Sequence, residues 1–370
     1  MLVEKVRKNL EREKTALLVL LRAGLWEKEP EDLSDFPLSN DSWLNLFQMA
    51  RRQSVTGIVY RGVCRLPEEL LPSQGLLMQW TVAVDRIEKR NRKMNDVLGD
   101  LYDMWGAENR PLLLKGQGVA SFYEVPLVRE CGDIDLYFSE KGKEKQAVEA
   151  IVRQGVEVRK CPDQSLFCRW KGIEIEIHPR LIDIYNPCAY RWLQQLEEKN
   201  GRPVSLKDTG GPEIEIPSPM LKRLLLDTHI LKHALGRGIG LRQLCDMARA
   251  CDGLHGKVDA EAMKQISHRL GIRKWNKLLH AFLVDYLGLD SKYLPYAERE
   301  KDAEPLLEIV WKGGNFGMYP EGKTQGPLNG WRGKMATLRA FLKNLRFSGY
   351  YAPKETRWLM WNLVVGQFKK

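Results

Sequence analysis

The 370-residue sequence lacks the signatures of several common protein classes. Its seven cysteines include no Cys-x-x-Cys pair, and its six histidines do not cluster with them at the spacing of zinc ligands. We therefore expect reduced, structural thiols in a cytoplasmic protein. There is no Gly-x-Ser-x-Gly elbow and no His-Glu-x-x-His helix, which argues against a serine hydrolase of that type and a zinc protease.

Long apolar runs are also missing. The run TALLVLL at 15–21 is much shorter than a bilayer requires. The first residues carry acids as well as bases, so we do not expect a signal or transit peptide. Hydrophobic residues make up 44% and charged residues 29% of the chain, enough apolar material for a sizeable core.

The positive charge is uneven. The net charge is +10, and residues 328–370 hold nine lysines and arginines against one acid, Glu355. The rest of the chain is nearly neutral, so we do not expect nucleic acid to coat it. In this basic tail, 334–347 has apolar residues at helical spacing. The tail is either a helix docked on the core or a surface for an anionic membrane, RNA or another acidic partner.

The residue pattern changes twice along the chain. Helical periodicity dominates at first, short strands and helices alternate from residue 111, and helices return after residue 187. We therefore predict a helical N-terminal region (1–105), an α+β core with a mixed sheet (106–205) and a helical C-terminal region with a basic tail (206–370).

Local signals predict where some elements begin and end. Asp41 is the expected N-cap of a helix that continues to residue 63. A tight turn at 171–172 should join two strands in a hairpin. Ser218 and Pro219 form a cap and first-turn pair for a helix after the core.

Two carboxylates lie one residue apart in RECGDIDLYF, residues 129–138. Side chains alternate along a strand, so Asp133 and Asp135 should share one face while Ile134 and Leu136 enter the core. By the same rule, Glu174, Glu176 and His178 share the polar face of the strand GIEIEIH. Alternation on an ordinary half-exposed strand would look the same.

If these two strands are neighbours, three or four carboxylates converge and repel one another unless a cation is present. Mg²⁺ suits oxygen ligands shared with phosphates, and two such ions can clamp both oxygens of a phosphoryl displacement. His178 either contacts substrate or phosphate, or is a strand-end histidine bonded to the backbone.

The segment LLLKGQG at 112–118 predicts a strand that runs into a glycine turn. Backbone N–H groups in such a turn favour anions, and Lys115 adds a charge for a phosphate. Gly-Lys-Ser/Thr does not follow, so it is not a Walker A loop. A plain strand-to-helix turn is the alternative.

Together these segments resemble the nucleotidyltransferase superfamily that includes DNA polymerase β, and within it a group of bacterial proteins called uncharacterised nucleotidyltransferases. The similarity is carried by Leu114-Lys115-Gly116, by the Tyr123–Pro126 turn, by Arg129, by Gly132-Asp133-Ile134-Asp135, by Glu176-Ile177-His178, by His229 and His233, and by Arg242 and Asp246. The segment GGNFG at 313–317 is also similar. The chain departs from the superfamily pattern at Gln117, where Ser or Gly is usual, and at Glu176, where Asp is usual.

The resemblance implies a polymerase-β-like core in which Asp133, Asp135 and Glu176 are the catalytic carboxylates and hold two Mg²⁺ ions. It implies that the nucleotide lies against Lys115, Gly116, Gln117, Arg129 and Gly132. Further cleft candidates are Glu174, His178, His229, His233, Arg242 and Asp246. From the residues alone, the histidine pair at i, i+4 could equally serve helix packing, and Arg242 with Asp246 could be a helix ion pair.

The expected reaction is Mg²⁺-dependent transfer of a nucleoside monophosphate from an NTP to a hydroxyl. The acceptor is an unidentified small molecule, saccharide or protein, and nucleic acid is less favoured. The alternative is a catalytically inactive module that binds nucleotide or a partner on the same fold. We expect a cytoplasmic protein that could lie peripherally at a membrane through its basic tail.

Overall fold

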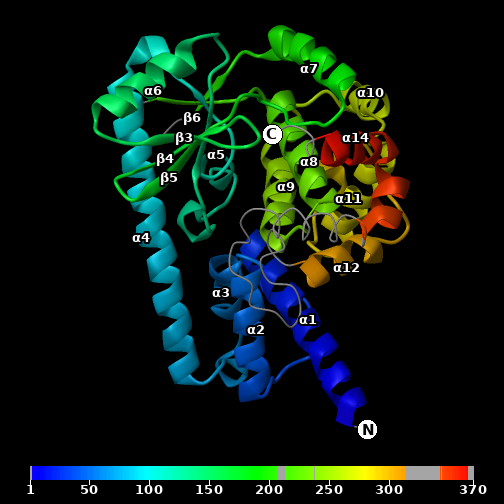
Figure 1. The fold of residues 1–370 in the computed structure, drawn as a ribbon. Coiled ribbons are helices and arrows are strands. Elements are labelled where there is room, and N and C mark those ends of the chain that lie inside the picture. Colours follow the sequence, from blue (N-terminus) through cyan, green and yellow to red (C-terminus); the bar gives the residue numbers. More distant parts are fainter. Residues whose placement is uncertain (1, 207–212, 237, 314–341, 343, 366–370) are drawn as a thin grey trace.

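The computed structural model describes residues 2–206, 213–236, 238–313, 342 and 344–365, which form helices around one mixed sheet (Figure 1). The helices of the first half are α1 (Leu2–Trp26), α2 (Asn40–Arg52), α3 (Thr56–Val63), α4 (Gln74–Trp105), α5 (Gln117–Ala120) and α6 (Lys143–Arg153). Those of the second half are α7 (Pro187–Asn200), α8 (Pro219–Leu235), α9 (Leu241–Gly253), α10 (Ala260–Leu270), α11 (Arg273–Asp285), α12 (Glu304–Gly313) and α14 (Pro353–Val365). The strands are β1 (Leu112–Leu113), β2 (Ile134–Tyr137), β3 (Val158–Lys160), β4 (Leu166–Trp170), β5 (Ile173–Ile177), β6 (Val204–Leu206) and β7 (Ile214–Ile216).

The sheet is mixed, and its seven strands lie in the order β3-β4-β5-β2-β1-β7-β6. Strand β2 runs parallel to β5 and antiparallel to β1, and β1 runs parallel to β7. The predicted hairpin is confirmed: β4 and β5 pair antiparallel, and Lys171 and Gly172 both have positive φ, at 49° and 80°. This combination is the turn that matches the twist of a two-residue hairpin. The α+β prediction is confirmed.

The sheet continues beyond residue 205, where we expected the core to end. The predicted boundary cuts through β6, and β7 pairs with the central strand β1. From the sequence, residues 201–217, which end in PEIEIP, are expected to be a connector with a possible short strand, because three residues carry little periodicity. Only its pairing with β1 makes it part of the sheet.

Helix α4 connects two apolar cores. Its first half contributes Leu76, Trp80 and Val84 to a core formed by the helices. Its second half, including Met94 and Trp105, packs beneath the sheet in a second core with α6. At 32 residues the helix is roughly 48 Å long, and Figure 1 shows it running along one side of the molecule.

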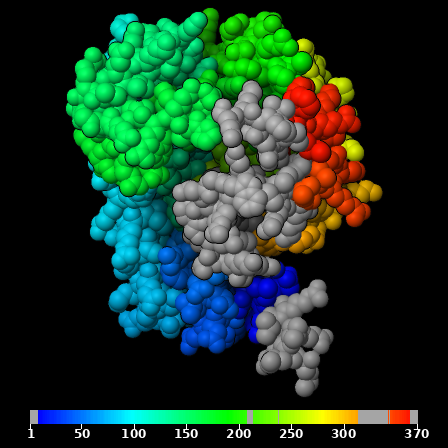
Figure 2. Space-filling model, viewed as in Figure 1, coloured from blue at the N-terminus to red at the C-terminus, as the bar shows by residue number. Residues whose placement is uncertain are grey.

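The helical regions at the two ends of the chain share a single core. Residues from α1, α2 and α3 lie in the same apolar cluster as residues from α8, α9 and α11. Hydrogen bonds tie the regions together: Trp26 Nε1 donates to Leu287 O at 2.5 Å, and Gln53 Oε1 accepts from Leu241 N at 3.0 Å. In Figure 2 the sheet and α4 occupy one flank of the visible face, and α14 the other.

Two of the predicted helix starts can be compared directly. Helix α8 begins at Pro219 with Ser218 as N-cap, as predicted. The N-cap of α2 is Ser39 and not Asp41, because the Ser39 hydroxyl accepts from Ser42 N at 3.2 Å. Asp41 then lies in the first turn, where its charge favours the helix dipole. The expected single helix to residue 63 breaks at Ser54, whose φ is +53°.

Parts of the expected basic tail, and most of the segment GGNFG, lie outside the described residues. This applies to all but the first residue of GGNFG at 313–317, and to 334–341 and 343 of the basic segment. The described end is α14, whose Glu355 side chain is buried. Within the ranges given above, every helix falls short of the length and apolar content needed to cross a bilayer.

Candidate functional site

Three adjacent strands bring the predicted site together. Strands β2 and β5 are neighbours, so the condition for convergence of their carboxylates is met, and Asp135 is the register partner of Glu176. Strand β1 lies on the other side of β2, with Leu113 opposite Leu136. The apolar residues of β5 are buried and the alternating residues Glu174, Glu176 and His178 are partly exposed, as the pattern predicts.

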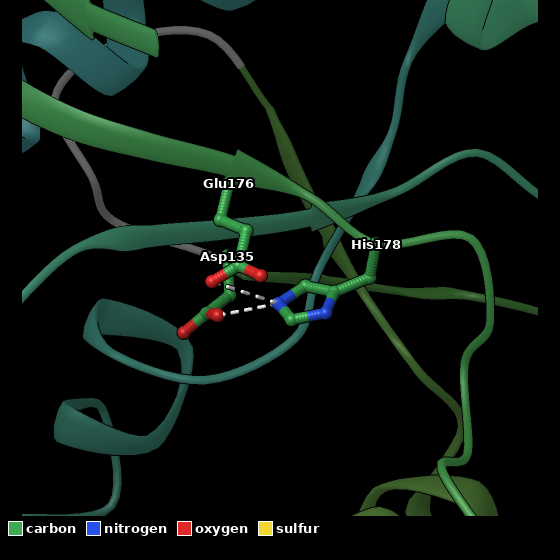
Figure 3. A group of neighbouring side chains, drawn as sticks. All are labelled: Asp135, Glu176 and His178. Carbon is green, nitrogen blue, oxygen red and sulfur yellow. Dashed lines mark hydrogen bonds and ion pairs between the residues drawn. The ribbon is translucent and has the colours of Figure 1, made fainter. Parts of the chain in front are cut away.

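Asp135 is the centre of the polar cluster. Its Oδ1 lies 2.9 Å from Lys115 Nζ and 2.6 Å from His178 Nε2. The same imidazole nitrogen lies 3.9 Å from Glu176 Oε2. Figure 3 shows the His178 ring with this nitrogen turned toward both carboxylates. One ligand atom from each of Asp135, Glu176 and His178 lies within 4.8 Å of the other two, an arrangement that could hold a metal ion.

The glycine turn after β1 holds Lys115 against Asp135. Leu114 N donates to Asp135 O at 2.9 Å, which aligns the end of β1 with β2. Gly116 then adopts φ +56°, and a Cβ there would lie 3.2 Å from Asp133 O. A residue with a side chain would be strained at this position, so the turn requires glycine.

Asp133 lies just before β2 and lines the same pocket. The charge of Asp135, together with burial, raises the pKa of Asp133 to about 6. Burial alone would also raise the pKa of Asp135, but the ammonium of Lys115 and the hydrogen bond from His178 hold it well below its usual range. The two aspartates therefore differ: Asp135 is a stable carboxylate, whereas the ionised form of Asp133 is repelled.

Lys115 balances part of this negative charge. Burial would lower the pKa of its ammonium, but Asp135 and Asp133 raise it above the usual value. The cluster therefore repels itself less than the three carboxylates alone would suggest. The expectation of a strongly self-repelling site applies to Asp133 but not to Asp135, because Asp135 already has cationic partners.

A pocket of about 260 Å³ lies between this edge of the sheet and helices α8 and α9. Of the predicted site residues it is lined by Lys115, Gly116, Arg129, Gly132, Asp133, Asp135, Glu176, His178, His229, His233, Arg242 and Asp246. The other two are not among its lining residues. Glu174 forms an ion pair with Arg169 at 2.6 Å, and both polar atoms of the Gln117 amide are buried without a hydrogen-bond partner in the described structure.

Helix α8 supplies two imidazoles to the pocket wall. The rings of His229 and His233 meet edge to face with centroids 4.5 Å apart. Burial, with the charge of Lys115 nearby, lowers the pKa of His229 well below its usual value, and the same causes lower that of His233 to about 3. Both imidazoles are therefore neutral near pH 7, and each can donate one hydrogen bond and accept another without adding charge to the pocket.

Asp246 forms its ion pair with Arg129 from the segment before β2. Arg129 donates through Nε and Nη2 to the two carboxylate oxygens at 3.0 and 2.5 Å, and the Tyr123 hydroxyl donates to Oδ1 at 2.8 Å. Arg242 donates from Nη1 to Glu130 O at 2.9 Å. These contacts connect α9 to the sheet and fix the width of the pocket, a role that the helical spacing of Arg242 and Asp246 did not indicate.

Several polar residues at the site were missed by the sequence reasoning. Lys222 is fully buried and donates to Leu114 O at 2.7 Å, directly before Lys115. Asp183 and Lys232 form an ion pair on the pocket wall. Neither Lys222 nor the Asp183–Lys232 pair lies in a recognisable motif.

The sequence also contains GMYPEGKT at 317–324, which has Walker A spacing but lies outside the described residues.

Comparison with known proteins places the chain in a family. A family model described as uncharacterised nucleotidyltransferase matches residues 39–288, a range that includes every predicted site residue. No curated protein and no solved structure matches the chain. Since the match covers more than half of the sequence, the chain belongs to this family of uncharacterised nucleotidyltransferases.

Proposed function

We propose, from membership of this nucleotidyltransferase family, that the protein transfers a nucleoside monophosphate from an NTP to a hydroxyl of an acceptor in a Mg²⁺-dependent reaction. The observation that carries the proposal is the pairing of Asp135 with Glu176 across β2 and β5, with Asp133 in the same pocket. The bond between the α- and β-phosphates breaks and pyrophosphate leaves, while the acceptor hydroxyl loses its proton to water and its oxygen bonds to the α-phosphorus.

The donor set fits Mg²⁺. Asp133, Asp135 and Glu176 offer carboxylate oxygens, the ligands that Mg²⁺ prefers when it also binds substrate phosphates. The charge of Asp135, together with burial, raises the pKa of Asp133, and a cation between the two carboxylates would relieve this repulsion. When bound, Mg²⁺ would neutralise charge that develops on the phosphate oxygens.

The other pocket residues support a phosphate ligand. The ammonium of Lys115 can turn from Asp135 to a phosphate oxygen, since its side chain is 17% exposed and lines the pocket. Arg242 adds a guanidinium from α9 to the pocket lining. The neutral imidazoles of His229 and His233 can orient the acceptor hydroxyl without attracting the phosphates themselves.

Release of pyrophosphate tests the proposal. The purified chain is incubated with each NTP and Mg²⁺, with mixtures of small alcohols, saccharides and proteins as acceptors. Asp135→Asn should reduce release by at least about 100-fold, because one charged group at the reacting phosphate is lost. Glu174→Gln is the matched control, since Glu174 lies on the same strand but outside the pocket.

Two results would count against this function. Equal release by the wild type and Asp135→Asn would remove the carboxylates from the reaction. Binding of NTP and Mg²⁺ by calorimetry, without release under any acceptor mixture, would favour the inactive binding module on the same fold.

A further inference from the structure

His178 holds a place in the carboxylate cluster that is not needed to orient Asp135. Lys115 already bonds Asp135 Oδ1 at 2.9 Å, and the backbone of β2 is fixed by its pairing with β1 and β5. The His178 imidazole nevertheless points one nitrogen at Asp135 and Glu176 together (Figure 3). In the structure Nε2 donates to Asp135, but the imidazole tautomer that carries its proton on Nδ1 would offer the Nε2 lone pair between two carboxylates, which is the position of a metal ligand.

We propose that His178 Nε2 is a metal ligand, an inference that rests on the proposed function. The position formed by Asp135, Glu176 and His178 then takes a transition-metal ion such as Mn²⁺ in preference to Mg²⁺. The second position, between Asp133 and Asp135, consists of carboxylates alone and suits Mg²⁺ that arrives with the nucleotide.

The spacing of the ligand atoms is compatible with one ion. In an octahedral site with bonds of about 2.1 Å, neighbouring ligands lie roughly 3 Å apart and opposite ligands about 4.2 Å apart. The 3.9 Å between His178 Nε2 and Glu176 Oε2 falls within this range. The 2.6 Å between His178 Nε2 and Asp135 Oδ1 is a hydrogen bond in the absence of metal, and a bound ion would take the place of its proton and increase this distance.

Backbone pairing fixes the position and the face of His178 in the absence of an ion. His178 N donates to Leu136 O at 2.8 Å, so the residue continues the pairing of β5 with β2 one position beyond Ile177. The alternation of the strand therefore continues too, and His178 stays on the face of Glu176. Register and face are both set by the sheet, as a preformed ligand requires.

The ligand set decides the preference between ions. Mg²⁺ binds oxygen ligands and keeps several waters, so an imidazole adds little to its affinity. Imidazole nitrogen favours first-row transition metals, and Mn²⁺ also accepts carboxylates and phosphates readily. Removal of His178 should therefore weaken Mn²⁺ binding much more than Mg²⁺ binding.

Pulsed electron paramagnetic resonance of the full chain with Mn²⁺ tests the inference directly, because it detects nitrogen bonded to the ion. The wild type should show nitrogen coupling, and His178→Gln should lose it. By calorimetry, the Kd for Mn²⁺ should rise at least about tenfold in this variant, and that for Mg²⁺ less than about threefold. His229→Gln and His233→Gln are matched controls, since both histidines line the same pocket.

The outcomes separate this inference from the proposed function. Bound Mn²⁺ without nitrogen coupling in the wild type would overturn the inference and leave a carboxylate site for the proposed reaction. Coupling lost in His229→Gln or His233→Gln instead of His178→Gln would overturn the assignment of the ligand. Failure of the wild type to bind either ion, alone or with NTP, would overturn both. If His178→Gln does not fold, selective ¹⁵N labelling of histidine in the wild type still reports whether an imidazole is bonded. A change from ¹⁴N to ¹⁵N coupling that persists in His229→Gln and His233→Gln supports the inference, and no change overturns it.

Discussion

Replacement of Arg129 by methionine should destabilise the protein by about 3–5 kcal/mol, the usual cost of removing one partner of a buried ion pair. Arg129 and Asp246 are joined by two hydrogen bonds at 3.0 and 2.5 Å, and their side chains are only 5% and 6% exposed. Methionine fills a similar volume but leaves the Asp246 carboxylate buried. Its remaining partner in the described structure is the Tyr123 hydroxyl.

For a 370-residue chain that unfolds in one transition, this loss corresponds to a fall in Tm of about 4–6 °C. Thermal and urea unfolding of Arg129→Met, Asp246→Asn and the double variant measure it. The double variant should lose at least about 1 kcal/mol less than the sum of the single variants, because no buried charge is left unpaired. Arg159→Met is the control: its ion pair with Glu157 is exposed and should leave Tm unchanged.

The same variant distinguishes the two roles considered for Arg129. If Arg129 only positions α9 against the sheet, the affinity for NTP with Mg²⁺ should stay within about threefold of wild type well below Tm. A larger loss would support the predicted nucleotide contact. A destabilisation below about 1 kcal/mol, or strict additivity in the double variant, would refute the reasoning that this pair clamps the two parts of the pocket.

Three further predictions concern other charged groups. In Lys115→Met the ammonium no longer competes with Mg²⁺ at Asp135, so Mg²⁺ alone should bind more tightly, whereas NTP should bind more weakly. Calorimetry that shows weaker binding of both Mg²⁺ and NTP would contradict this competition. Without metal at pH 8, Asp133→Asn should raise Tm and Asp135→Asn should lower it, because the environment raises the pKa of Asp133 to about 6 and depresses that of Asp135; shifts of the same sign would contradict the assignment. With Mg²⁺ and NTP at a hundredfold excess over Kd, the wild type should gain about 2.7 kcal/mol of stability, and neither variant should reproduce this gain. Burial raises the pKa of Glu355 from 4.5 to about 7, so the folded state favours its protonated form and the free energy of unfolding should fall by up to about 3 kcal/mol between pH 5 and pH 8. Glu355→Gln should remove this pH dependence, and parallel profiles of stability against pH for the variant and the wild type would show that Glu355 is not its source.

The candidate site could be predicted from the sequence where it depends on local backbone geometry. Alternation along a strand places Asp135 on one face of β2, and the same rule places Glu176 and His178 on one face of β5. The glycine turn could also be predicted, because Gly116 needs a positive φ that other residues rarely adopt. Each of these features involves residues within a few positions of one another.

Pairs that are distant in sequence were predicted less well. The helical spacing of Arg242 and Asp246 suggested an ion pair within α9, but the structure pairs Asp246 with Arg129, which lies 117 residues earlier. The pairing of β6 and β7 with the rest of the sheet, and the packing of α4 in both cores, were not predicted for a related reason. A helix or strand is recognised by its own period, whereas the core that it joins depends on which other elements cover it.

The sequence by itself determined the type of most elements, the face on which each carboxylate lies and the glycine turn beside Lys115, because these follow from the backbone geometry of a few consecutive residues. Only the tertiary structure decided that β2 pairs with β5, that Lys115 and His178 share Asp135 Oδ1, and that α8 and α9 close the pocket. Those contacts join segments separated by tens to more than a hundred residues. They form because burying the apolar faces of the sheet and helices selects one arrangement, and the polar faces meet as a consequence.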